Sequence, residues 1–145
     1  MSDMPATTFD VSDEVDSDIG GLRFSVSFRA PAGVTLRVSA ELENGRQEVL
    51  RFDDFVEKPH YHVPSSADAT IIDPKEVGAP LDFYIAQIRD NLRGLLVQGG
   101  FPQLAEAVDL AAVTRDVDLV RQSMIDIVPD GYVRVPGVGL QRAGS

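Results

Sequence analysis

The sequence predicts an α+β fold: an antiparallel meander sheet of four or five strands, covered on one face by two or three helices. Two observations lead to this prediction. Between residues 22 and 63, hydrophobic and polar residues alternate with a period of two, which is typical of strands that bury one face. From residue 80 onward, the apolar spacing follows the 3.6-residue period of amphipathic helices. The turns between the predicted strands are too short for the crossovers of a parallel sheet, so we expect antiparallel pairing.

The clearest predicted strand is "LRFSVSFRA", residues 22–30, whose inward face is formed by Leu22, Phe24, Val26 and Phe28. After a turn at residues 31–33, a second strand at residues 34–42 repeats the alternation, and Asn44-Gly45 then predicts a tight hairpin turn. Further strands are predicted at residues 47–55 and 60–63, and residues 69–73 would supply the fifth.

The helical part begins with a long helix at residues 80–98, with Pro80 in its first turn and Gly99-Gly100 at its end. Its apolar stripe is formed by Leu81, Tyr84, Ile85, Ile88, Leu92, Leu95 and Leu96. A second helix is expected to open at Phe101-Pro102, and Thr114 is the expected cap of a third. The pattern leaves open whether residues 102–128 form one kinked helix or two. Residues 132–135 are predicted to form a last edge strand.

The chain of 145 residues is long enough for one hydrophobic core, and we expect a single α+β domain at residues 19–135. A disordered acidic arm is expected at residues 1–18, and a flexible tail at residues 136–145. The arm carries six of the acids behind the net charge of −10 and no base. Such a segment is usually solvated, and less often it docks on a basic partner.

Composition excludes several classes of function. The chain has no cysteine, which excludes disulfides, thiolate zinc sites and cysteine nucleophiles. No apolar run approaches the roughly 20 residues that span a bilayer, and the N-terminus lacks a signal-peptide pattern, so we expect a cytoplasmic protein with no membrane contact. Basic residues are too scattered for binding duplex nucleic acid. No nucleotide-binding loop and no G-x-S-x-G motif occurs, and no cofactor is predicted.

The segment "RFDDFVEKPHYHV" holds both histidines of the chain, His60 and His62. On a strand, their side chains point to the same face and could converge on one metal ion, as H-x-H pairs do in zinc and iron sites. The third ligand would come from one of four aspartates: Asp53, Asp54, Asp68 or Asp73. The alternative, which is the more common role for such histidines, is a pair of polar residues on a sheet face or at an interface.

The two strands of this segment can pair in two registers. A four-residue loop places Asp53 opposite His62, and a three-residue loop places Asp54 there. Either register puts a carboxylate beside His62. Because a neighbouring negative charge favours the imidazolium, we expect the pKa of His62 to be raised.

Residues 43–105, with their R-F-D-x-F…P-H-Y-H block and the helix that follows, resemble a little-described family of small bacterial proteins. That family is in turn faintly similar to TumE-type toxins of toxin-antitoxin pairs. The resemblance implies a ribonuclease-like or nucleotide-transfer-blocking domain. Its matching positions are Arg51, Asp53, His60 and His62.

Two hypotheses for function follow. In the first, the protein is a non-catalytic interaction module that self-associates as a homodimer or binds another protein. Its contact would be the exposed sheet face, or the side of the long helix that carries Phe83 and Ala86. In the second, it is a toxin-like ribonuclease or metal-dependent hydrolase, with Arg51, Asp53, His60 and His62 as catalytic candidates and the two histidines as metal ligands. A catalytic site requires His62 beside a carboxylate in a cleft, whereas an interface requires a flat surface with apolar neighbours.

Overall fold

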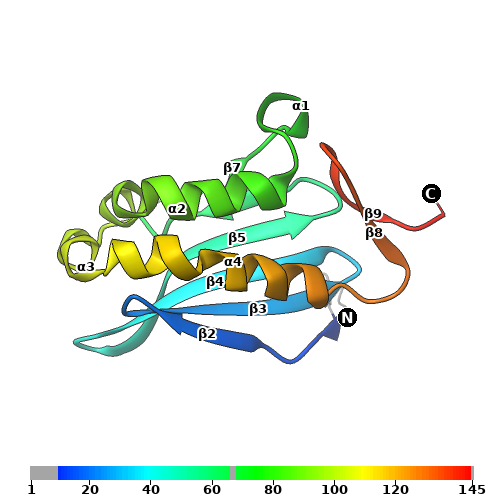
Figure 1. Cartoon of the computed structure of the whole chain (residues 1–145). Coiled ribbons are helices and arrows are strands. Elements are labelled where there is room, and N and C mark those ends of the chain that lie inside the picture. The colour runs from blue at the N-terminus through cyan, green and yellow to red at the C-terminus, as the bar shows by residue number, and fades with distance from the viewer. Residues whose placement is uncertain (1–9, 66–67, 145) are drawn as a thin grey trace, which may run out of the picture.

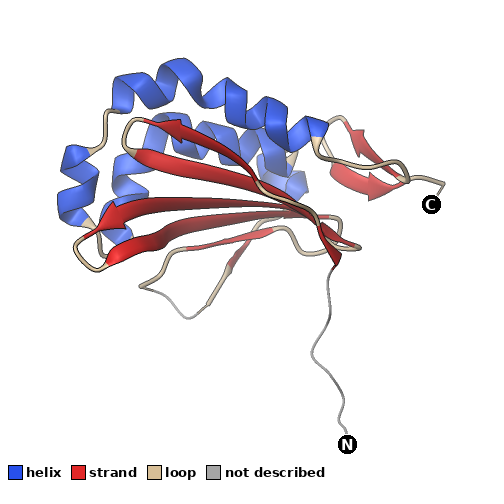
Figure 2. Cartoon of the chain, turned by 90° about the horizontal axis from the view of Figure 1, so that it is seen from below, coloured by secondary structure: helices blue, strands red, loops and turns tan. Residues whose placement is uncertain are grey.

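An antiparallel sheet forms one layer of the molecule, and two long helices lie side by side across one of its faces (Figure 1). The computed structural model describes residues 10–65 and 68–144 of the chain. The α+β fold class predicted from the sequence is confirmed. Figure 2, seen from below, shows that the helices all lie on the same side of the large sheet.

The large sheet contains seven strands: β1 (Asp10–Val11), β2 (Val15–Ile19), β3 (Leu22–Ala30), β4 (Gly33–Leu42), β5 (Gly45–Phe55), β6 (His60–His62) and β7 (Thr70–Ile71). Strands β3 to β7 follow one another as an antiparallel meander, as expected. The four inward residues predicted for β3 are at most 4% exposed and pack in the core. A register shift between Val38 and Ser39 lets both Val49 and Leu50 of β5 be buried.

The two additional strands come from the segment expected to be a disordered arm at residues 1–18. In the structure β1 and β2 both pair with the free edge of β3, whereas residues 1–9 lie outside the described residues. Between them, Ser12 accepts a hydrogen bond from Phe28 N–H through its hydroxyl (2.8 Å) and donates one from its own N–H to Phe28 O (2.9 Å). The acids of this segment also find partners, because Asp18 pairs with Arg23 at 2.8 Å.

Four helices follow the sheet: α1 (Pro74–Val77), α2 (Pro80–Gln98), α3 (Pro102–Ala107) and α4 (Leu110–Asp126). Helix α2 has the predicted bounds, and all seven residues of its predicted stripe are buried. Residues 102–128 contain two separate helices. Thr114 does not cap the second of them; the cap is Asp109, whose carboxylate accepts a hydrogen bond from Ala112 N–H at 3.1 Å.

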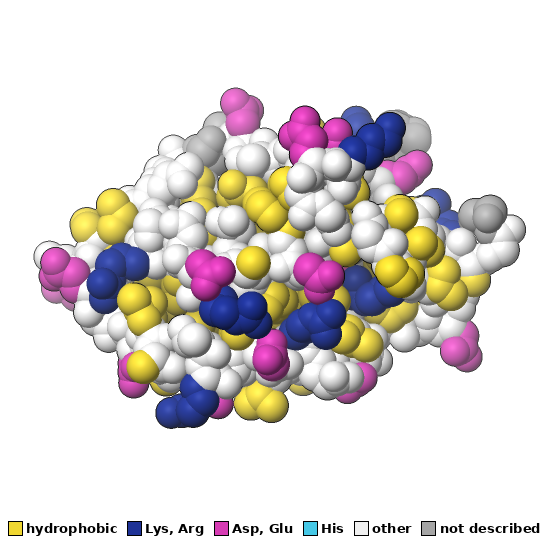
Figure 3. All heavy atoms as spheres, turned by 45° about the horizontal axis from the view of Figure 1, so that its top comes forward, with side chains coloured by type: hydrophobic (Ala, Val, Ile, Leu, Met, Phe, Trp, Pro, Cys, Tyr) yellow, Lys and Arg dark blue, Asp and Glu magenta, His cyan; other side chains and the backbone are white. Residues whose placement is uncertain are grey.

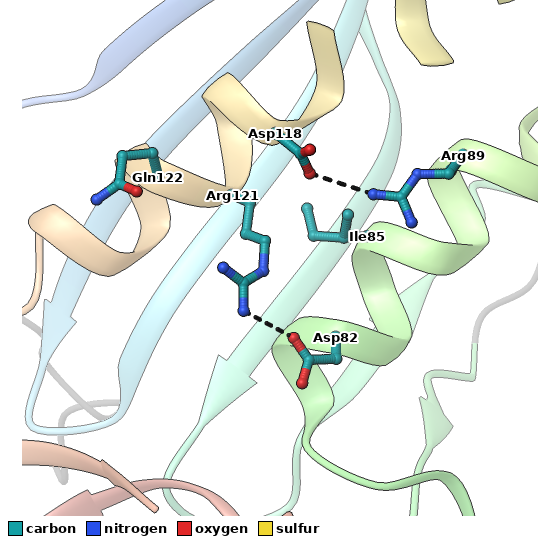
Figure 4. A pocket seen from close by; sticks show the side chains of 6 residues that line it. All are labelled: Asp82, Ile85, Arg89, Asp118, Arg121 and Gln122. Atoms are coloured by element: carbon teal, nitrogen blue, oxygen red, sulfur yellow. Dashed lines mark hydrogen bonds and ion pairs between the residues drawn. The ribbon is translucent and has the colours of Figure 1, made fainter. Parts of the chain in front are cut away.

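Helices α2 and α4 are linked on their outer surface by ion pairs. Arg89 contacts Asp118 at 3.2 Å, and Arg121 contacts Asp82 at 3.0 Å. These pairs line a depression of about 440 Å³ with Ile85 between them (Figure 4). Figure 3 shows basic and acidic side chains next to one another across this face. Every charge in these two pairs has a partner, so the depression is explained by helix packing.

The C-terminal residues form a second, two-stranded sheet from β8 (Tyr132–Val135) and β9 (Gly139–Arg142). The structure differs here from two expectations, since residues 132–135 do not join the large sheet and the expected tail at residues 136–145 contains a strand. The physical reason is anchoring. Leu140 is 1% exposed within the core, and Arg134 reaches the carboxylate of Asp54 in β5 at 2.7 Å.

Candidate metal centre

The histidine pair lies on the β5–β6 hairpin, on the sheet face away from the helices. In the observed register Asp53 is opposite His60, and Arg51 is opposite His62. Both registers expected from the sequence are therefore wrong, because each placed a carboxylate opposite His62. The reason is that the pairing of β5 with β6 stops at Asp53, so the connection from Asp53 to His60 spans residues 54–59 and is longer than the three or four residues expected.

Three side-chain nitrogen atoms lie close to one carboxylate oxygen. The Oδ2 atom of Asp53 lies 3.0 Å from His60 Nε2, 3.7 Å from His62 Nε2 and 3.3 Å from Arg51 Nε. The other oxygen, Oδ1, accepts a hydrogen bond from the hydroxyl of Thr35 at 2.8 Å. Asp53 is only 1% exposed, so this network replaces the water that a carboxylate normally binds. The structure thus brings all four predicted site residues together.

The second nitrogen of His60 fixes what its first nitrogen can do. Nδ1 lies 2.7 Å from the carbonyl oxygen of Lys58, so it carries a hydrogen and donates it. In a neutral ring Nε2 is then an acceptor, and it faces the carboxylate of Asp53, which is also an acceptor. A positive species must lie between the two atoms, either a proton on the ring or a bound cation. The Nε2 atom of His62 is buried nearby and has no hydrogen-bond partner.

Helix α2 supports this hairpin from the core side through Tyr84. The hydroxyl of this fully buried residue donates a hydrogen bond shared between the backbone carbonyls of Asp53 (2.9 Å) and His60 (3.1 Å). Sequence reasoning placed Tyr84 in the apolar stripe and did not connect it with the histidines. Thr35 was also missed. The one indication of its role is that Thr35 on β4 lies directly opposite Asp53 on β5, and this can be recognised only when the strand pairing is known.

The pKa values of the three ionisable ligand candidates move in different directions. Burial raises the pKa of Asp53, but hydrogen bonds from His60 and Thr35 and the charge of Arg51 lower it by more, so the pKa lies below its ordinary value. The hydrogen bond to Asp53 raises the pKa of His60. Burial, together with the charges of Arg51 and His60, lowers the pKa of His62. The expected increase for His62 is therefore wrong, because the side chain is partly buried and its strand neighbour is a cation.

Among the four aspartates considered as a third ligand, Asp53 is the one that joins the histidines. The donor atoms of Asp53, His60 and His62 all lie within 4.8 Å of one another, and Asp68 is not part of this group. Asp54 points to the opposite face of the sheet and pairs with Arg134. Asp73 caps helix α1, where its carboxylate accepts a hydrogen bond from Lys75 N–H at 2.9 Å.

The surface beside the cluster is grooved and polar. A groove of about 290 Å³ crosses the open face of the sheet and is lined in part by Thr35, Arg37 and Arg51. His62 therefore lies near a carboxylate, and Arg51, which is opposite it in the sheet, lines this groove. The neighbouring surface is not the flat apolar one expected of an interface.

Comparison with known proteins places the chain in a family. Residues 16–124 match a family described as a domain of unknown function, DUF7700. The chain belongs to this family. No curated protein and no solved structure matches it. Among residues 10–65 and 68–144, no helix is both long and apolar enough to cross a membrane.

The DUF7700 match contains the whole candidate centre and its supports, Thr35 and Tyr84. It ends before the β8–β9 hairpin, so the contact of Arg134 with Asp54 lies outside the matched segment on one side. The family carries no assigned activity, and a function must be argued from the geometry of the site.

Proposed function

We propose that this DUF7700 domain binds a divalent transition metal ion, such as Zn²⁺, through Asp53, His60 and His62, and that it is a metal-dependent hydrolase. The observation that carries the proposal is the convergence of both imidazole Nε2 atoms on Asp53 Oδ2, at 3.0 and 3.7 Å. A cation at this point would satisfy all three atoms.

The spacing suits a metal ion. Zinc lies about 2 Å from nitrogen and oxygen ligands, so the ligand atoms of one tetrahedral ion are separated by about 3–4 Å. The supporting contacts are also those that metal ligands have. The Nδ1–H of His60 donates to a backbone carbonyl, and the second oxygen of Asp53 accepts from Thr35, which fixes the ring and the carboxylate in place.

The orientation of the rings favours a metal over metal-free acid–base catalysis. A toxin-like ribonuclease, the activity that the TumE-type resemblance implies, would need imidazoles that present a proton or a lone pair to the substrate. Here Nδ1 of His60 is occupied by Lys58, and Nε2 faces Asp53. Nε2 of His62 is buried. Both Nε2 atoms point towards Asp53, which suits chelation.

Arg51 opposes cation binding, because its guanidinium lies 3.3 Å from the same oxygen. Its Nε has no hydrogen-bond partner, and its side chain is 30% exposed and lines the groove. Rotation of Arg51 into the groove would therefore break no hydrogen bond of Nε. The carboxylate would exchange one positive partner for a stronger one.

A hydrolase function follows from the ligand number. Two histidines and one carboxylate leave coordination positions for water, and a bound Zn²⁺ lowers the pKa of that water to about 7. Hydroxide would then form at neutral pH. The chain's own residues supply the ligands and their supports.

The test is a titration of chelator-treated protein with Co²⁺, whose visible spectrum reports its ligands. We expect saturation at one ion per chain, and loss of binding in Asp53→Asn and in His62→Ala. Asp118→Asn, which removes an exposed carboxylate on α4, is the control and should bind as the unmodified protein does. The proposal is wrong if the unmodified protein binds no metal, or if the control loses binding as the two ligand variants do.

An interaction module is the second candidate, and the C-terminal hairpin favours it. Val133, Val135 and Val138 are exposed on or beside β8. In Figure 3 hydrophobic side chains gather at the end of the molecule where this hairpin lies. We propose this surface for self-association. Sedimentation should then show a dimer that Val133→Glu dissociates, and a monomer at all concentrations would exclude it.

A further inference from the structure

Two arginines lie directly opposite each other on the open face of the sheet. Arg37 of β4 pairs in register with Arg51 of β5, and Arg51 in turn lies opposite His62 of β6. Like charges at directly opposed positions are only about 5 Å apart at Cβ and destabilise a sheet. A row of three basic side chains therefore crosses three strands, and its two guanidinium groups concentrate positive charge on this face.

Among the described residues, each of these two arginines contacts a carboxylate. Arg37 contacts the carboxylate of Glu14, which belongs to the connection between β1 and β2. Arg51 contacts Asp53, which is a ligand in the proposed metal centre. An anion from outside would compete with Glu14 and Asp53 for the two guanidinium groups.

The groove that both arginines line has the size for a small anion. Its volume of about 290 Å³ lies just below the range for small-molecule sites, which begins at about 300 Å³. Guanidinium groups bind phosphate oxygens through paired hydrogen bonds in a fixed plane. We infer that the groove binds the phosphate group of a small phosphate ester between Arg37 and Arg51.

A nucleic-acid strand fits this groove less well. Glu14 and Glu48 also line it, and the chain carries a net charge of −10, so a polyanion would be repelled over most of the surface. A single phosphate group needs only the local pair of arginines.

Hydrolysis of such an ester is the deeper inference, and it rests on the proposed metal centre. The oxygen of a metal-bound water forms a new bond to phosphorus, and the bond from phosphorus to the alcohol oxygen breaks. The proton released by the water is taken up by the leaving alcohol oxygen. The products are the alcohol and inorganic phosphate, and no oxidant or reductant is required.

Glu14 provides a way to test the anion site. Its carboxylate occupies Arg37 in the structure and so competes with phosphate. Removing that charge should free Arg37. Glu14→Gln is therefore expected to tighten phosphate binding severalfold, whereas Asp118→Asn, which changes the net charge by the same amount on the helix face, should not.

The experiment is a calorimetric titration of chelator-treated protein with inorganic phosphate at fixed ionic strength. We expect weak, saturable binding that Arg37→Gln weakens about tenfold, the loss expected for one charge-assisted hydrogen-bond partner. Arg89→Gln is the matched control, since Arg89 also forms one ion pair and is 38% exposed against 45% for Arg37. It should bind phosphate normally. Arg37→Lys, which keeps the charge, should lie between the two, and thermal melting establishes that each variant is folded.

The inference is overturned if the folded protein binds no phosphate, or if Arg37→Gln and Arg89→Gln weaken binding equally. Because the protein is free of metal, this result is independent of the metal centre. Phosphate binding that depends on Arg37 in a protein that takes up no Co²⁺ would keep the anion site and remove the ester hydrolysis.

Discussion

Asp53 and Asp54 are neighbours in β5, and their side chains lie on opposite faces of the sheet. Both are buried, at 1% and 0% exposure. Asp53 is surrounded by Thr35, Arg51 and two histidines. Among the described residues, the one cation that contacts Asp54 is Arg134. Two aspartates at equal depth thus have very different surroundings.

The pKa values of the two carboxyls reflect this difference. Hydrogen bonds and a nearby cation hold the pKa of Asp53 below its ordinary value even though burial raises it. At Asp54 burial raises the pKa, and the charge of Arg134 offsets only part of the increase. Oδ1 of Asp54 and Nε of Arg134 also lack hydrogen-bond partners. The Asp54 pair joins one carboxylate to one cation and ties the C-terminal hairpin to the core, whereas Asp53 lies close to three side-chain nitrogen atoms.

Arg134→Ala should have the largest effect. It would leave the Asp54 carboxylate in the core without a counter-charge, and loss of one partner of a buried pair costs about 3–5 kcal/mol. Urea unfolding measures the change. The double variant Asp54→Leu with Arg134→Met removes both charges and should recover most of the loss. A small effect of Arg134→Ala would mean that Asp54 is neutral in the folded protein.

Asp53→Asn should cost less stability and remove more function. An asparagine can still accept from Thr35, and the histidines and Arg51 are partly exposed, so we expect a loss of about 1–3 kcal/mol in the free energy of unfolding. Metal binding should disappear, because the site loses its only carboxylate. Arg134→Ala should show the reverse pattern. It should lose more stability, and the molecules that remain folded should still bind Co²⁺. Equal effects of the two variants on metal binding would remove the distinction between the faces.

Tyr84→Phe tests whether the core side of the hairpin positions the ligands. The variant removes one hydrogen bond to the carbonyls of Asp53 and His60 and should cost about 1 kcal/mol. Supports of metal ligands typically contribute about 10–100-fold in affinity, and we expect weaker Co²⁺ binding in that range. Tyr61→Phe changes a hydroxyl on the same hairpin without removing either of these bonds and is the control. Equal Co²⁺ affinity in the two variants would limit Tyr84 to a packing role.

The contrast between the two aspartates also marks how far the sequence could predict this molecule. Alternation identified β3 and its inward residues, because a period of two depends only on neighbours along the chain. It placed His60 and His62 on one face for the same reason, whereas Arg51 and Asp53 were grouped with them through the family resemblance. The registers could not be obtained in this way. The pairing of β5 with β6 ends at Asp53, two residues before β5 itself ends, and this register puts Arg51 opposite His62.

Contacts between segments that are far apart in the sequence could not be predicted either. Nothing near Arg134 indicates that it meets a residue 80 positions away. The acidic composition of residues 10–18 suggested solvation, but Glu14 and Asp18 pair with arginines on the sheet. From the sequence alone, a run of like charges indicates disorder. The opposite charges that contact it in the folded chain cannot be identified from the sequence.

The smallest expected effect, and the most specific one, is a difference in pH dependence between the two histidines of the metal-free protein. The folded-state pKa of His60 is raised above its unfolded value of about 6.5. Its stabilisation is therefore fully present below about pH 6.5 and fades as the pH rises through the higher folded pKa. The folded-state pKa of His62 is lowered. Its contribution is present above about pH 6.5 and fades as the pH falls through the lower folded pKa.

The two alanine variants should consequently respond to pH in opposite directions. His60→Ala should cost more stability at about pH 5.5 than at about pH 8.5, and His62→Ala should cost less at the lower pH. Urea unfolding of both variants and the unmodified protein, all in chelator, measures these differences. Burial is the main cause of the lowered pKa of His62, and the charge of Arg51 opposite it adds to the effect, so Arg51→Gln should reduce the difference for His62→Ala. If both histidine variants instead lost more stability at the lower pH, His62 would be an imidazolium beside Asp53, and a lowered pKa for His62 would be wrong.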